Sequence, residues 1–142
     1  MSEDWPEYIK GHFDEIPFWR FLGTKVLETS RGYGKFRLPM KAEYSNDYGI
    51  MHGALTAAAV DMGAGLCLRT LKVRTVTVET QTTYFEAASL REDLIVEGRC
   101  VKEGRRLLHA EVEVKSTSGT LLAKGRAIYY VIGEDFAKDT QC

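Results

Sequence analysis

The sequence has 142 residues, of which 44% are hydrophobic and 27% are charged, and its formal net charge is −1 at pH 7. This length and composition are typical of one soluble globular domain with a single core. A net charge close to zero, with basic residues spread along the chain, gives no reason to expect nucleic acid as the main partner. We therefore expect one domain over residues 1–142, with a loose acidic tail from about 134 to 142.

Targeting and redox features favour a cytoplasmic location. The acidic amino-terminal segment lacks the basic and apolar regions of a signal peptide. The most apolar stretch, 50–68, contains His52, Asp61 and several glycines, so we do not expect it to span a membrane. The widely spaced cysteines are expected to be free thiols, and no closely spaced ligand pairs predict a zinc site.

Apolar spacing predicts a short helix at the amino terminus and two strands after it. Residues at intervals of four, four and three form one helical face over about 5–16: Trp5, Ile9, Phe13 and Ile16. Pro17 should stop this helix, and the aromatic segment 18–22 should form an apolar plug against the core. Alternating residues then predict strands over 24–30 and 33–40.

One long helix is predicted from His52 to about Leu71, after a loop over 41–51. Its apolar residues extend nearly all the way round, which predicts a buried helix rather than a surface helix. Gly63 and Gly65 lie inside it, and each costs about 1 kcal/mol relative to alanine. The two glycines therefore indicate that another element packs closely against the helix backbone.

After the helix, the apolar period changes from helical spacing to alternation. Segment 73–85 is rich in threonine and valine, and three further alternating segments lie around 94–100, 108–115 and 121–131. Short turns between these segments predict antiparallel pairing. The expected fold class is α+β, with a curved antiparallel sheet wrapped around one long central helix.

Gly53 and Asp61 are the two candidate catalytic residues of the long helix. Gly53 lies where the long helix should begin, at the positive end of its dipole, where backbone N–H groups have no partner inside the helix. It is either an oxyanion hole that a carbonyl oxygen can approach closely or an ordinary helix start. Asp61 lies among apolar residues and is either a general base or nucleophile or a structural carboxylate that accepts hydrogen bonds.

Helix geometry sets a condition on these two residues. They are eight positions apart, which is ~12 Å along a helix at ~1.5 Å per residue. A catalytic group must lie within hydrogen-bond reach of the reacting atoms, directly or through one water. If both residues act at one site, Asp61 of one protomer must face Gly53 of another in a two-fold dimer. The sequence therefore predicts a shared site and an obligate dimer.

This segment resembles the hotdog-fold thioesterases of the phenylacetic-acid-degradation type. The pattern that carries the resemblance is Asn46, Gly49, His52, Gly53, Leu55 and Asp61. Strand 76–84 is similar to the long central strand of that family, and the resemblance covers roughly residues 20–132. It implies a hotdog fold, dimers with continuous sheets that often pair into a dimer of dimers, and hydrolysis of an acyl-CoA to a free acid and CoA. It implies no metal or redox cofactor, since coenzyme A is part of the substrate.

The resemblance also implies roles for individual residues. Asp61 would be the general base or nucleophile, and the Gly53 N–H would bind the thioester oxygen. His52 and Asn46 would position the carbonyl or the attacking water, although a loop asparagine can also simply close an Asx turn. Thr77, on the strand beside the partner's site, would help to hold the water.

Five further residues are expected to contact the substrate. Gly49, Ala54 and Tyr84 lie in the segments that carry the resemblance, and Ala54 stands where the family often has a second glycine. The phosphates of CoA require positive charge. Arg105 and Arg106 follow Gly104 in a predicted turn, and they either bind these phosphates or form a solvated hairpin tip.

Two other functions stay open. The chain could be a non-catalytic module that binds or senses acyl-CoA, or an enoyl-CoA hydratase of the same fold. Hydratases of this fold usually pair an aspartate with a histidine at another spacing, and that pairing is not found here. The identity of the acyl group is not indicated by the sequence.

Overall fold

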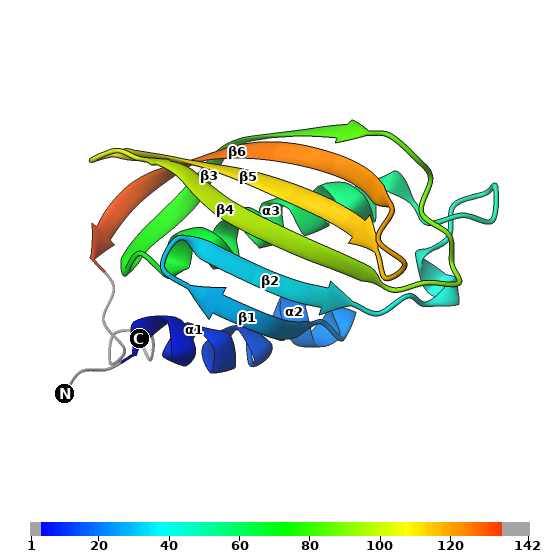
Figure 1. Ribbon diagram of the computed structural model, residues 1–142, viewed down its shortest axis with the longest axis horizontal. Helices are drawn as coiled ribbons and strands as arrows, with labels where there is room; N and C mark the ends of the chain where they lie inside the picture. Colours follow the sequence, from blue (N-terminus) through cyan, green and yellow to red (C-terminus); the bar gives the residue numbers. More distant parts are fainter. Residues whose placement is uncertain (1–3, 135–142) are drawn as a thin grey trace.

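The computed structural model describes residues 4–134. One antiparallel sheet curves around a long helix (Figure 1), with strand order β1-β2-β4-β5-β6-β3. The helical elements are α1 (Trp5–Asp14), α2 (Pro17–Leu22), the 3-10 turn η1 (Ala42–Tyr44) and α3 (Gly53–Arg69). The strands are β1 (Lys25–Ser30), β2 (Tyr33–Leu38), β3 (Val73–Tyr84), β4 (Leu94–Glu103), β5 (Leu107–Ser116) and β6 (Leu121–Glu134). The predicted α+β arrangement is therefore confirmed.

The amino-terminal segment differs from its prediction in two respects. Pro17 not only follows α1 but begins α2, where its fixed φ suits the first position of a helix. Trp19 and Leu22 of this short helix are buried as predicted, but Phe18 and Phe21 are 51% and 75% exposed. The predicted apolar plug is therefore half wrong, because a single helix turned against the sheet can bury only one of its faces.

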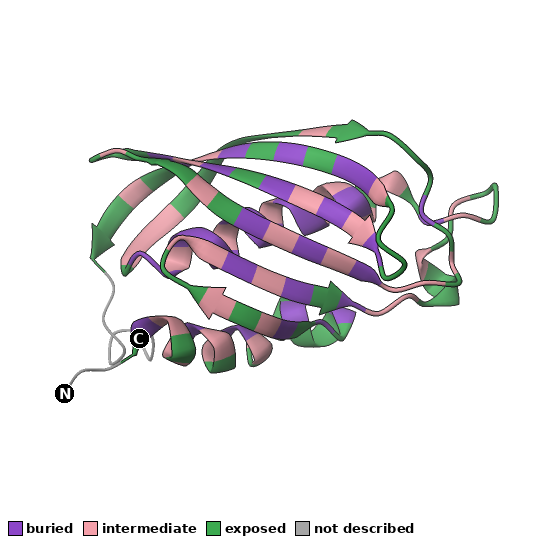
Figure 2. Cartoon of the chain, viewed as in Figure 1, coloured by how far each residue is buried: buried purple, intermediate pink, exposed green. Residues whose placement is uncertain are grey.

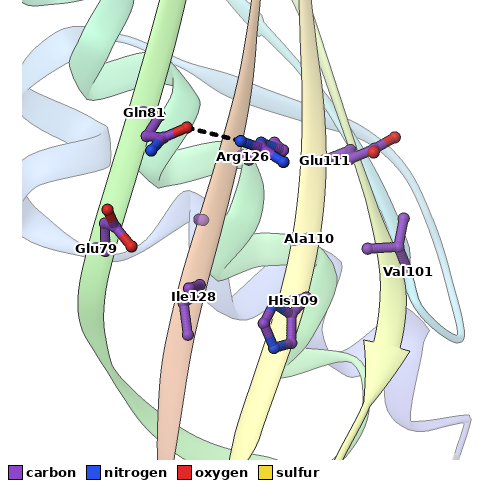
Figure 3. Close-up of a pocket in the computed structure, with 9 residues that line it drawn as sticks. Glu79, Gln81, Val101, His109, Ala110, Glu111, Arg126 and Ile128 are labelled. Carbon is purple, nitrogen blue, oxygen red and sulfur yellow. Dashed lines mark hydrogen bonds between the residues drawn. The ribbon is translucent and has the colours of Figure 1, made fainter.

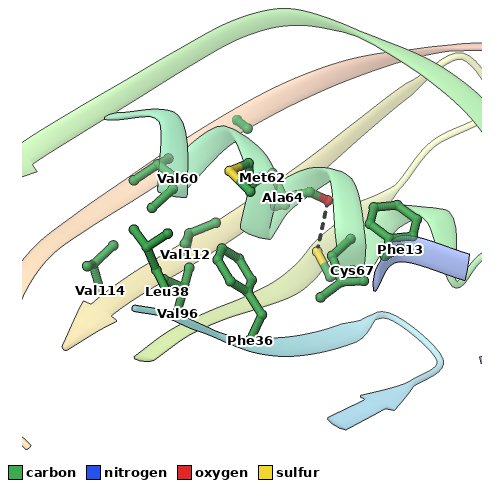
Figure 4. Close-up of a cluster of buried hydrophobic side chains, with 14 of the residues drawn as sticks. Phe13, Phe36, Leu38, Val60, Met62, Ala64, Cys67, Val96, Val112 and Val114 are labelled. Carbon is green, nitrogen blue, oxygen red and sulfur yellow. Dashed lines mark hydrogen bonds between the residues drawn. The ribbon is translucent and has the colours of Figure 1, made fainter. Parts of the chain in front are cut away.

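The core lies between α3 and the sheet. Buried and more exposed residues alternate along β2, β4, β5 and β6 (Figure 2), so that one face of each strand packs inward. Figure 4 shows the centre of this packing, where side chains of α3 meet those of three strands: Phe36, Leu38, Val60, Val96, Val112 and Val114. Cys67 is buried on α3, Cys100 is partly exposed, and neither forms a disulfide.

Glycines allow α3 to lie close to the sheet. A Cβ at Gly98 of β4 would collide with the carbonyl oxygen of Gly63, and a Cβ at Gly63 would lie 3.0 Å from the side chains of Val96 and Val112. The close packing against the helix backbone that the sequence predicted is therefore confirmed, and Gly98 is the residue that makes it possible.

β3 is one of the two edge strands of the sheet, and β1 is the other. β3 pairs only with β6, and none of its residues is buried. β6 extends to Glu134, and the rest of the predicted tail, 135–142, lies outside the described residues. Among the helices of residues 4–134, none is both long enough and apolar enough to span a membrane.

We expect Gly98→Ala to destabilise the fold by about 1–3 kcal/mol or more, because its Cβ has no space against the backbone of α3. Gly11→Ala is the matched control, since a Cβ at Gly11 in α1 has no neighbour within 4 Å. That control should be stabilised slightly, by up to about 1 kcal/mol. Urea unfolding followed by circular dichroism measures both changes, and equal midpoints for Gly98→Ala and the wild type would contradict the packing argument.

Candidate active site

The carboxylate of Asp61 accepts two hydrogen bonds from the sheet. Thr77 on β3 donates its hydroxyl to Asp61 Oδ1 at 3.0 Å, and Tyr129 on β6 donates its hydroxyl to the same oxygen at 2.5 Å. The Tyr129 hydroxyl also lies 2.8 Å from the main-chain carbonyl oxygen of Asp61. Thr77 and Tyr129 are register partners on neighbouring strands, so their side chains reach the same turn of α3.

The two oxygens of the Asp61 carboxylate differ in their environment. Both donors bind Oδ1, and Oδ2 accepts no hydrogen bond from residues 4–134. Asp61 is half-buried, although its neighbours Val60 and Met62 on the helix are buried. A carboxylate that is oriented through one oxygen and open at the other can accept a proton from water or attack a substrate carbon.

Tyr129 is the site residue that the sequence analysis missed. Burial raises the pKa of its phenol, and the hydrogen bond to the Asp61 carboxylate raises it further, so the hydroxyl stays a donor. Gly65 makes room for it, because a Cβ there would lie 3.3 Å from the hydroxyl oxygen. The signal was present in the sequence, since a tyrosine on the inward face of a strand requires a hydrogen-bond partner.

A second group of predicted residues gathers at the amino-terminal end of α3. His52 is the N-cap, and its Nδ1 accepts the N–H of Ala54 at 3.0 Å. Tyr84 donates its hydroxyl to the Gly53 carbonyl oxygen at 2.7 Å. The Gly53 N–H makes no hydrogen bond to another residue of the described chain. It lies at the positive end of the helix dipole, so it can receive an oxygen that carries developing negative charge.

The loop before α3 is held by Asn46. Its Oδ1 accepts the N–H groups of Tyr48 at 2.9 Å and Ile50 at 3.3 Å, as in an Asx turn. Gly49 follows with φ +81°, a left-handed conformation that favours glycine. The backbone N–H of His52 donates to the carbonyl oxygen of Tyr44 at 2.7 Å, which ties this loop to η1. The Asn46 side-chain oxygen therefore shapes the loop that leads to His52.

Within one chain, the predicted site residues form three separate groups. Gly53 and Asp61 lie at different turns of α3, as the helix distance required. Arg105 and Arg106 lie in the hairpin between β4 and β5, at the end of the sheet opposite to the start of α3 (Figure 1). Both arginines are exposed, and Arg106 Nη1 donates to the hydroxyl oxygen of Tyr130 at 3.1 Å. Within one protomer, Arg105 and Arg106 therefore do not lie beside Gly53.

Two hollows are candidates for ligand binding. One, of about 320 Å³, lies on the outer face of the sheet and is lined by polar and charged side chains that include Glu79, His109 and Arg126 (Figure 3). None of the predicted site residues lines it. The other, of about 420 Å³, has Asp61 and Tyr129 in its wall. Of the two, the second hollow is the one with a predicted site residue in its wall. In the described part of the chain, no three histidine, cysteine or acidic side chains gather to hold a metal ion.

Comparisons with known proteins identify the family. The family model of the thioesterase superfamily matches residues 48–123. This range includes His52 and Gly53 at the start of α3, Asp61 farther along the helix, and Thr77 on β3. The chain belongs to the thioesterase superfamily. Human acyl-coenzyme A thioesterase 13 is 32% identical to it over 131 residues, which are 89% of this chain and 93% of the human protein. The thioesterase class that the sequence predicted is thereby confirmed.

Comparisons with solved structures confirm the hotdog fold. The PaaI protein of the E. coli phenylacetic acid degradation operon matches with a TM-score of 0.87 at 13% identity, over 94% of this chain and 99% of its own. A Streptococcus mutans protein bound to acetyl CoA matches with a TM-score of 0.82 at 24% identity, over 88% of this chain and 99% of its own. At these sequence identities, both matches show that the fold is the same.

We expect Tyr129→Phe to destabilise this thioesterase by about 1–3 kcal/mol at neutral pH, because the Asp61 carboxylate loses a charge-assisted donor. The effect should depend on pH. Since the folded-state pKa of Tyr129 is raised, its contribution is complete below about pH 10, the ordinary tyrosine value, and is lost as pH rises through the raised pKa. The variant should therefore lose less stability than the wild type on going to alkaline pH.

Urea unfolding at about pH 7 and about pH 11 measures this difference. Tyr48→Phe is the control, because the Tyr48 side chain is 82% exposed and donates to no described residue. The control should follow the wild type at both pH values. Parallel losses of stability in Tyr129→Phe and the wild type would contradict the assigned hydrogen bond.

Proposed function

We propose that this protein hydrolyses an acyl-CoA thioester to a free acid and CoA, at a site that two protomers share. The observation that carries the proposal is the Asp61 carboxylate, which lies in the wall of the adjacent cavity and which Thr77 and Tyr129 hold through one oxygen, while the other accepts no hydrogen bond from the described chain. The name of the human relative, acyl-coenzyme A thioesterase 13, and the acetyl CoA bound to the Streptococcus mutans protein support the substrate class.

Asp61 would activate the attack on the thioester carbonyl carbon through Oδ2. In one route it removes a proton from water as the water adds to the carbon, and in the other it attacks the carbon itself and water then hydrolyses the mixed anhydride. In both routes the carbon–sulfur bond breaks and the CoA sulfur leaves with a proton. The net change consumes one water and releases a carboxylic acid and the CoA thiol.

The amino-terminal end of α3 would stabilise the oxygen of the tetrahedral intermediate. The Gly53 N–H has no partner within the described chain, and the helix dipole adds to its positive potential. Ala54 cannot give a second donor in this arrangement, because its N–H is bonded to His52 Nδ1. Tyr84 holds the Gly53 carbonyl and lines this end of the helix. Asn46, Gly49 and His52 would keep the loop in place around the thioester.

The unpaired edge of β3 supports a dimer. β3 is 12 residues long and its Val76 and Val78 side chains are 49% and 57% exposed, and a long exposed edge strand favours pairing with another strand. Two β3 strands that pair antiparallel across a two-fold axis would form one continuous sheet. They would also reverse the direction of the second protomer, which brings its Arg105 and Arg106 toward the end where the first protomer has Gly53. Assembly beyond this dimer stays a prediction of the sequence resemblance.

We expect Asp61→Asn to retain binding of an acyl-CoA and to lose turnover by about 10²–10⁴, the usual contribution of a general base. Release of free thiol from a panel of acyl-CoA substrates measures the loss. Glu111→Gln is the matched control, because Glu111 is exposed on β5 and should keep wild-type turnover. Wild-type rates in Asp61→Asn would remove Asp61 from the mechanism.

The same assay separates the alternatives that the sequence left open. An acyl-CoA-binding module would bind the panel without releasing thiol. A hydratase would convert an enoyl-CoA without releasing thiol. Release of thiol by the wild type, lost in Asp61→Asn, supports hydrolysis alone.

Gly53→Pro tests the oxyanion hole. Gly53 is the first residue of α3 and His52 has φ −64° and ψ 132°, a conformation that suits the residue before proline. The substitution therefore removes the N–H while keeping the helix start, and we expect turnover to fall by about 10²–10³. Gly53→Ala is the control that keeps the N–H, since its Cβ would lie 3.4 Å from the Tyr84 ring. Equal losses in both variants would assign the effect to bulk and not to the N–H.

Mixing the two inactive variants tests the shared site. A dimer of one Asp61→Asn protomer and one Gly53→Pro protomer has one site with both defects and one intact site. Random pairing of equal amounts should therefore restore about a quarter of the wild-type rate. If mixed dimers form and show no more activity than either variant alone, both groups act within one protomer or not at all.

A further inference from the structure

The Tyr129 hydroxyl contacts both the side chain and the main chain of Asp61. It donates to Asp61 Oδ1 at 2.5 Å, and it lies 2.8 Å from the carbonyl oxygen of the same residue. A phenol has a single proton to donate, so the shorter contact is the stronger hydrogen bond. Because Oδ1 must lie beside this hydroxyl, few of the staggered side-chain conformations remain open to Asp61.

The two donors to Oδ1 come from unequal parts of the sheet. Tyr129 lies on β6, which pairs with β5 on one side and with β3 on the other, and its side chain is 6% exposed. Thr77 lies on β3, an edge strand of this chain, and it is exposed. A buried ring on a central strand moves less than an exposed hydroxyl on an edge strand. Tyr129 is therefore the more rigid of the two donors.

An irregularity in β3 adds to this difference. The register between β3 and β6 shifts between Thr77 and Glu79, with Val78 as the extra residue. Glu79 faces the outer side of the sheet, so strict alternation would turn Val78 and not Thr77 toward α3. The bulge therefore brings the Thr77 hydroxyl to Asp61. The register of β6 with β5 is regular at Tyr129, so this side chain reaches α3 without such a bulge.

The surroundings of the Tyr129 hydroxyl keep it a donor. Burial raises the pKa of the phenol, and the hydrogen bond to Asp61 raises it further, so the hydroxyl keeps its proton at neutral pH. Gly65 leaves the space that the hydroxyl needs, because a Cβ there would lie 3.3 Å from its oxygen. In the described lining of the hollow, Asp61 is the one charged side chain. No second ionic group in that wall therefore competes with Tyr129 for Oδ1.

We propose that Tyr129 is a positioning residue of the reaction, whose hydroxyl holds Oδ1 of Asp61 and leaves Oδ2 as the oxygen that acts on the thioester. This inference rests on the function proposed above and adds a residue to it. Tyr129 lies outside residues 48–123, which the family model matches. A reacting group that is misplaced by about 1 Å can lose about 10²-fold in rate, so a donor that fixes one oxygen affects turnover directly.

Kinetics of Tyr129→Phe test the proposal, because this variant keeps the ring and removes only the hydroxyl. We expect kcat for an acyl-CoA to fall by about 10–10²-fold while KM stays within about twofold. Tyr33→Phe is the matched control. Tyr33 donates its hydroxyl to the Glu97 carboxylate at 2.7 Å, on the outer face of the sheet, so its loss removes the same kind of bond away from Asp61. Wild-type kcat in Tyr129→Phe, or equal losses of kcat in both variants, would overturn the proposal.

The pH dependence of kcat separates positioning from a loss of folded protein. Removing a donor from a carboxylate disfavours its charged form, so Tyr129→Phe should move the acidic limb of the profile to higher pH by about one unit. The position of this limb does not depend on how much of the protein is active. Tyr33→Phe should keep the limb of the wild type. An unmoved limb in Tyr129→Phe would contradict the proposed role.

A measurement without turnover makes the test independent of the proposed function. The carbon-13 resonance of the Asp61 carboxyl carbon, assigned by its absence in Asp61→Asn, should titrate at higher pH in Tyr129→Phe than in the wild type. If it does so while no acyl-CoA of the panel is hydrolysed, Tyr129 holds Asp61 and the hydrolase proposal alone fails. If acyl-CoA is hydrolysed while neither the resonance nor the acidic limb moves, the positioning role alone fails.

Discussion

The close approach of α3 to the sheet is the constraint on which the rest of the structure depends. Gly63 and Gly98 lack side chains where the helix backbone meets β4, so no larger residue separates the two layers. Gly65 leaves space for the Tyr129 hydroxyl one helical turn beyond Asp61. Because the layers are this close, Thr77 and Tyr129 can reach the Asp61 carboxylate directly. The same packing that closes the core therefore positions the acidic group of the site.

A single rigid helix is also the physical reason for proposing a site that two protomers share. α3 offers a positive amino terminus at Gly53 and a carboxylate at Asp61, and these two groups cannot approach each other within one chain. Hydrolysis of a thioester requires both near one carbonyl carbon. The unpaired edge of β3 supplies a physical reason for a second protomer to be present. In the proposed dimer, association and chemistry would both follow from this geometry.

The sequence analysis succeeded where local patterns decide structure and failed where distant residues meet. Apolar alternation located the strands, and the two helix glycines indicated close packing before their partner Gly98 was known. Segment 18–22 was predicted to form an apolar plug, whereas Phe18 and Phe21 are exposed, because the orientation of a six-residue helix is set by its neighbours. The bond between Tyr129 and Asp61 was not predicted either, since these residues are 68 positions apart.

The sequence by itself determined the α+β architecture, the buried helix and the family pattern from Asn46 to Asp61, because periodicity, glycine positions and short motifs are local properties of a chain. Only the tertiary structure decided which oxygen of Asp61 is held and which stays open, and which residues form the cavity beside it. Those features arise where α1, α2, α3, β3 and β6 converge. Their geometry depends on packing between segments whose separation along the chain carries no information about their distance in space.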